Sequence, residues 1–131
     1  MQQKDKIIGM IGLGSFLLTM LIKGVIRPMH LQLAPFADYL IGVLPNFFAA
    51  TGFCAIAYIR FKKYFLQQNI DNFFIKSIIA AVLFAFFGLT AWEYIQYAAW
   101  SYPIDTQDIL MSLLGSLIIG AIAYFIGEKN K

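Results

Sequence analysis

The sequence predicts an all-α fold, a bundle of four transmembrane helices with both termini in the cytoplasm. Hydrophobic residues make up 60% of the 131 residues and charged residues only 13%, which is too apolar for a soluble domain of this size. Four long apolar runs follow one another, and each can cross a hydrocarbon core about 30 Å thick as a helix. Short basic clusters alternate with these runs, as topology signals do in membrane proteins.

The first two helices are expected at about residues 7–26 and 39–59, within a single integral membrane domain that covers residues 1–131. A cleaved signal peptide is the rival interpretation of the first run, but the run is long for one and no A-x-A-like cleavage site follows it. Residues 27–38 are expected to form a loop. Inside the second helix, Pro45 should cause a kink and free a carbonyl oxygen upstream, which neighbouring groups must then satisfy.

The other two helices are expected at about residues 73–97 and 106–126. A polar connection rich in lysine and glutamine, residues 60–72, precedes the third helix. Tyr102 and Pro103 mark the membrane interface and the turn into the fourth helix. The third and fourth helices are therefore expected to be antiparallel neighbours.

The positive charges predict the orientation of the helices. Lys23 and Arg27 fall near one end of the expected bundle, after the first apolar run. The other eight of the ten basic residues fall toward the opposite end, at Lys4, Lys6, Arg60, Lys62, Lys63, Lys76, Lys129 and Lys131. Because cytoplasmic loops carry the excess of Lys and Arg, both termini and residues 60–72 are expected in the cytoplasm.

Polar side chains gather in the outer half of the expected bundle. Glu93 should lie about 6 Å below the outer end of the third helix, and Asn46 about 10 Å deep in the second. An ionisable group inside a span is costly to bury and indicates a functional site by default. The expected ligand-binding site in the outer leaflet consists of Lys23, Asn46, Glu93, Gln96, Asp105 and Asp108.

Several of these residues also have a structural interpretation. Asp105 and Asp108 match the N-cap and N3 positions of the fourth helix, where carboxylates accept backbone N–H groups. Lys23 could extend its amine to the lipid headgroups instead of pairing with an acid. Glu93 could form a hydrogen bond between helices. No motif indicates a metal site or a cofactor, and the single cysteine, Cys54, is expected to be a buried structural thiol.

Small residues recur along one side of the fourth helix. Such residues let two helix backbones approach closely, so they predict helix–helix contacts. The residues expected at these contacts are Ser112, Gly115, Ser116 and Gly120.

The stretch at residues 92–120 resembles the signature of the VanZ-like membrane proteins. Three steps carry the resemblance: Glu93-x-x-Gln96, Asp105-x-x-Asp108 and Ser112-x-x-Gly115. In the family, a Glu and a Gln end one helix, an Arg lies in the following loop, an Asp opens the last helix, and an Asn-x-x-Gly step follows. Tyr102 stands where the loop Arg is expected, and Ser112 stands where the Asn is expected. The resemblance implies a bacterial envelope protein, in some members linked to glycopeptide-antibiotic resistance.

The residues and the resemblance together favour a binding or accessory protein of the bacterial inner (plasma) membrane. Its outer-leaflet pocket would recognise an envelope lipid or glycolipid and contribute to cell-envelope processes or glycopeptide tolerance. The alternative is a membrane-embedded enzyme that acts on a lipid-linked substrate, with Glu93 and Asp108 as an acid/base pair. The expected partners are membrane lipids rather than nucleic acid.

Overall fold

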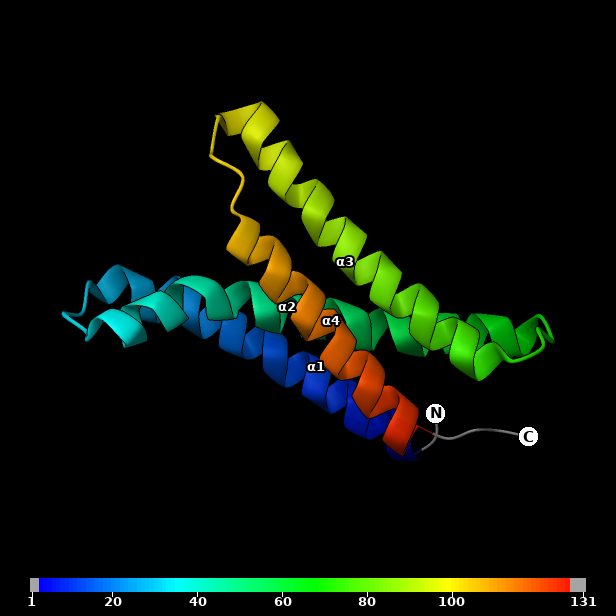
Figure 1. Ribbon diagram of the computed structural model, residues 1–131. Helices are drawn as coiled ribbons and strands as arrows, with labels where there is room; N and C mark the ends of the chain where they lie inside the picture. Colours follow the sequence, from blue (N-terminus) through cyan, green and yellow to red (C-terminus); the bar gives the residue numbers. More distant parts are fainter. Residues whose placement is uncertain (1–2, 128–131) are drawn as a thin grey trace.

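The computed structural model describes residues 3–127, and this part of the chain is an all-α bundle of four long helices without a β-strand (Figure 1). The helices are α1 (Gln3–Leu21), α2 (Pro35–Gln67), α3 (Phe73–Trp100) and α4 (Thr106–Ile126). A π-helical turn, η1 (Ile22–Ile26), and a 3₁₀ turn, η2 (Arg27–Met29), continue α1 without a break. All four segments are long and apolar enough to cross a membrane, as the sequence predicts.

The bounds of α4 are those that the sequence predicts, but the expected end of the second helix at residue 59 is wrong. Helix α2 continues to Gln67 and contains 33 residues, so it is about 50 Å long and exceeds the thickness of a hydrocarbon core. The polar residues expected to form a connection are helical because they have tertiary partners. Lys62 is buried, and Phe61 meets Phe84 of α3 edge-to-face with ring centroids 6.0 Å apart. Only residues 68–72 remain as the turn into α3.

The expected loop at residues 27–38 is also shorter in the structure. Helix α2 begins at Pro35, a residue that suits the first helical position because its φ is fixed and its missing N–H has no helical partner there. Helix α3 ends at Trp100 instead of residue 97, and Ser101 closes it in a left-handed conformation while donating its N–H to the carbonyl oxygen of Tyr97. These shifts lengthen the helices but preserve their order and number.

Buried charges join the first two helices at the end of the bundle that contains Gln3 and Gln67. The Lys62 Nζ atom lies 2.8 Å and 3.0 Å from the two carboxylate oxygens of Asp5. Their side chains are only 6% and 10% exposed. From the sequence, Lys62 is expected in a loop, where it counts as a topology signal. The structure instead places it in a buried ion pair that links the first turn of α1 to the C-terminal part of α2.

Helix α2 is the centre of the bundle, because it packs against α1, α3 and α4. Helices α1 and α4 meet only lightly, and α3 packs against α2 and α4 rather than against α1. Figure 1 shows that the end of α2 and the start of α3 (both green) meet at residues 68–72, and that the two helices diverge toward Pro35 and Trp100. The bundle is therefore closed at one end and splayed at the other.

Candidate functional site

A cavity of about 610 Å³ lies where the helices splay apart. Residues from the turns η1 and η2, from α2, from α3 and from the first turn of α4 line it. Its polar lining residues are Lys23, Arg27, Asn46, Glu93, Gln96 and Asp108. Its apolar lining residues are Ala49, Phe53, Phe84, Ala85, Gly88, Leu89 and Trp92.

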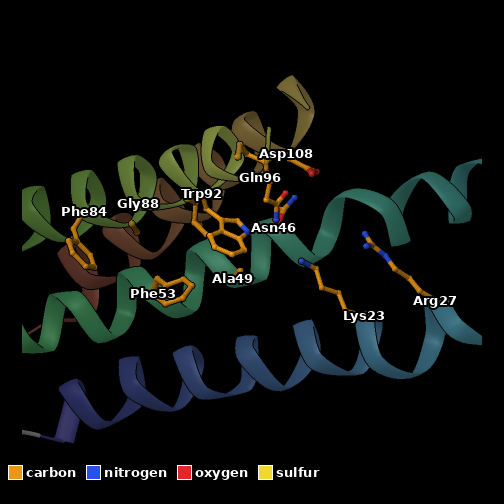
Figure 2. A pocket seen from close by; sticks show the side chains of 13 residues that line it. Lys23, Arg27, Asn46, Ala49, Phe53, Phe84, Gly88, Trp92, Gln96 and Asp108 are labelled. Carbon is orange, nitrogen blue, oxygen red and sulfur yellow. The ribbon is translucent and has the colours of Figure 1, made fainter. Parts of the chain in front are cut away.

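The polar side chains lie at the splayed end and the apolar ones lie deeper. Figure 2 shows Gln96 and Asp108 near the tip of Asn46, with Lys23 and Arg27 extending toward α2 from the other side. Phe53 and Phe84, at the far end of the same view, are about half-way along α2 and α3. Along α3 the lining runs from Phe84 to Gln96, which is about 18 Å of helix. The cavity thus changes from polar to apolar over roughly half of a membrane's thickness.

Aromatic contacts border the deep end of the cavity. Phe84 meets Phe61 edge-to-face with ring centroids 6.0 Å apart, and Phe53 meets Phe16 of α1 in the same way at 5.0 Å. Gly88 lies between Phe84 and Trp92 on the lining face of α3, and a Cβ atom there would meet no atom within 4 Å. The cavity therefore includes the space that a side chain at residue 88 would fill.

The two acids of the cavity face different partners. The Asp108 carboxyl group lies near the side chain of Asn46, so the first turn of α4 and α2 meet at this point. The Glu93 carboxyl group faces the backbone N–H of Asp105, which joins α3 to the start of α4. The carboxylates of Glu93 and Asp108 also interact electrostatically with each other. Both side chains are half-buried, so they remain available to a molecule in the cavity.

Arg27 holds a backbone group that Pro45 leaves unpaired. Pro45 has no N–H to donate to the carbonyl oxygen of Ile41, four residues earlier. The Arg27 Nε and Nη2 atoms lie 3.3 Å and 3.2 Å from that oxygen, and Nη2 lies 2.6 Å from the carbonyl oxygen of Gly42. A neighbouring group thus satisfies the freed carbonyl oxygen, as expected from the sequence, and the same contact fixes Arg27 at the rim of the cavity.

The structure brings together Lys23, Asn46, Glu93, Gln96 and Asp108 of the site expected from the sequence. Asp105 is different, because it is exposed and does not line the cavity. Its side chain caps α4 by accepting a hydrogen bond of 2.8 Å from the backbone N–H of Gln107. The π-helical turn η1 carries Lys23 at the end of α1, and such turns often occur at functional sites.

The small residues of α4 lie against other helices rather than in the cavity. Ser112 and Ser116 are buried, and their hydroxyl groups donate to carbonyl oxygens one turn earlier in α4. Gly115 lies directly against the α2 backbone near Phe47, and Gly120 faces Val82 of α3. Cys54 is buried, and its Sγ atom lies 3.6 Å from the Ser116 carbonyl oxygen across the α2–α4 interface.

Sequence reasoning missed Arg27 and the apolar walls of the cavity. The site expected from the sequence includes neither Arg27 nor any apolar residue of α2 or α3. One signal could have found the wall: Phe84, Gly88, Trp92 and Gln96 recur at a spacing of four, so they share one face of a helix with a gap at the glycine.

Comparisons of the chain with protein-family models, with curated proteins and with solved structures found no match. Among residues 3–127, no group of three or more His, Cys, Asp and Glu side chains is arranged to hold a metal ion. The fold and the chemistry of the cavity are thus the basis for a functional proposal.

Proposed function

We propose that this protein is a multi-pass protein of the bacterial plasma membrane that binds an envelope lipid or glycolipid in the cavity between its splayed helices. In this role it contributes to cell-envelope processes, with tolerance of glycopeptide antibiotics as the outcome that the VanZ-like resemblance implies. Both termini and residues 68–72 face the cytoplasm in this proposal, and the polar end of the cavity faces the outer leaflet.

One observation carries the proposal: a single cavity has charged and amide side chains at one end and aromatic and aliphatic side chains at the other. An amphiphile has the same division, with a polar headgroup and apolar chains. Helices α1 and α3 do not pack against each other on either side of the cavity, so the described helices leave a lateral route from the bilayer. A lipid can thus enter with its headgroup level with Glu93 and its chains toward Phe53.

The electrostatic interaction between Glu93 and Asp108 favours a second candidate function, an enzyme acting on a lipid-linked substrate. Two carboxyl groups in one cavity can serve as acid and base if their proton affinities differ. The variant Glu93→Gln distinguishes the two functions. An enzyme would lose turnover with this variant and still bind lipid, whereas a binding protein has no turnover to lose and changes only in lipid affinity.

Filling the cavity tests lipid binding directly. Gly88→Leu should project a side chain into the cavity and displace the lipid, while the helix contacts stay intact because the site is open. Gly14→Leu is the matched control, since Gly14 also has no atom within 4 Å of an added Cβ atom but does not line the cavity. Native mass spectrometry of the purified proteins should show co-purified lipid with the parent chain and Gly14→Leu, and much less with Gly88→Leu. Equal lipid retention by all three proteins would refute the proposal.

A further inference from the structure

The cavity holds charges of both signs on opposite walls. Lys23 and Arg27 extend from the turns that follow α1 (Figure 2), while Glu93 and Asp108, which also line the cavity, belong to α3 and α4. Lys23 interacts electrostatically with both acids, so the charges share one space. Within residues 3–127, however, Lys62 and Asp5 form the sole ion pair with an N···O distance of 4.0 Å or less. The cations and carboxylates of the cavity are therefore separated by a gap rather than joined.

This separation has a physical consequence at membrane depth. Charges in a low-dielectric region are costly unless an opposite charge or hydrogen-bonding groups compensate them. A direct contact between Lys23 and Glu93 would compensate both, but the splay of the helices keeps them apart. A molecule that carries an anion beside Lys23 and a cation beside the acids would bring a compensating charge to both sides of the gap.

The acid side is suited to a group that donates several hydrogen bonds. The carboxylate oxygens of Glu93 and Asp108 and the amide oxygen of Gln96 are acceptors at the same end of the cavity. A primary ammonium offers three N–H donors to such acceptors, whereas a trimethylammonium offers none. The indole ring of Trp92, which lies between α2 and α3 in Figure 2, adds a surface that attracts cations.

We propose that the cavity selects a phospholipid whose headgroup joins a phosphate to a primary ammonium. The phosphate lies against Lys23 and the rim at Arg27, and the ammonium lies among Glu93, Asp108 and Gln96. The acyl chains lie along Phe53 and Phe84 toward the centre of the bilayer. This inference rests on the proposed lipid-binding function and narrows it to one headgroup chemistry.

The test is a competition among three lipids with identical acyl chains. The purified full-length protein is mixed with equal amounts of phosphatidylethanolamine, phosphatidylglycerol and phosphatidylcholine, and native mass spectrometry measures the ratio of bound species in one sample. We expect the ethanolamine lipid to exceed each of the others by about tenfold, the ratio that one additional charge-assisted hydrogen bond provides. Because the ratio is internal to each sample, it does not depend on how much of the protein is folded.

Three variants test the contacts to the ammonium and to the phosphate separately, and a fourth is the control. Glu93→Gln and Asp108→Asn keep the shape of the side chain and remove a carboxylate charge, so the preference over phosphatidylglycerol should disappear. Lys23→Gln should lower the binding of all three phosphate-containing lipids and leave their ratio largely unchanged. Asp38→Asn is the control, because Asp38 is exposed near the same end of the bundle and does not line this cavity.

The outcomes distinguish this inference from the proposed function. Equal binding of the three lipids, or a preference for phosphatidylglycerol, would overturn the headgroup selection and leave lipid binding in place. An ethanolamine preference that persists in both Glu93→Gln and Asp108→Asn would also overturn it. Absence of any bound lipid in the parent protein would overturn both.

Discussion

The guanidinium group of Arg27 hydrogen-bonds to the carbonyl oxygen of Ile41, the oxygen that Pro45 leaves without a helical donor. A residue at the end of the first transmembrane segment thus completes the second helix across the bundle. The contact couples the rim of the cavity to the backbone of α2. Its strength should therefore depend on whether residue 45 is a proline.

A double-mutant cycle measures that dependence. Arg27→Ala should lower the free energy of unfolding by about 1–3 kcal/mol, because it leaves a carbonyl oxygen unsatisfied. In a Pro45→Ala background, the new N–H at residue 45 can bond to Ile41, so Arg27→Ala should cost clearly less. Reversible unfolding in mixed detergent–SDS micelles supplies the four values. An equal cost of Arg27→Ala in both backgrounds would contradict the link between the two residues.

The buried ion pair between Lys62 and Asp5, at the other end of the bundle, predicts how single and double variants change the stability of the protein. Lys62→Met or Asp5→Leu alone should destabilise the protein by about 3–5 kcal/mol, because each breaks a buried ion pair by removing one of its two charges. The double variant should cost much less than either single change, since it removes both charges together. Lys63→Met is the control, because Lys63 is the exposed neighbour in the same helix and should change stability by about 0.5 kcal/mol or less. Additive costs in the double variant would refute the pairing.

The number, order and approximate positions of the helices could be predicted because hydrophobic runs of membrane length are a strong local signal. The end of α2 could not be predicted from local polarity, because Lys62 reads as a loop residue by its charge but is buried against Asp5, a residue far away in the sequence. The polar part of the cavity was predictable, since Glu93 and Asp108 stand out in apolar surroundings. Its apolar wall was harder to predict, because composition does not distinguish Phe84 from a lipid-facing residue and only its spacing of four from Gly88 and Trp92 indicates the wall.

The contact between α4 and α2 makes Gly115 sensitive to one methyl group. A Cβ atom there would collide with the backbone carbonyl group of Phe47 and approach the Ala50 side chain to 3.1 Å. Backbone cannot move aside as a flexible side chain can, so Gly115→Ala should cost about 1–3 kcal/mol of stability. Gly14→Ala, where the added atom meets open space, should be neutral or slightly stabilising because alanine favours helix over glycine. Comparable unfolding midpoints for the two variants would show that α4 does not approach α2 so closely.

The final prediction concerns which end of the bundle faces the cytoplasm. Residue 32 precedes the start of α2, residue 67 is its last residue, and both are exposed, so single cysteines at these positions report opposite sides of the membrane. The native thiol is buried against the Ser116 carbonyl oxygen, and Cys54→Ala removes it as a background signal. If the excess of basic residues directs their end inward, a membrane-impermeant maleimide should label Gln32→Cys in intact cells and Gln67→Cys only after the membrane is permeabilised. The reverse pattern would invert the topology and place Glu93 and Asp108 in the inner leaflet, where the proposed cavity would open to cytoplasmic lipids instead.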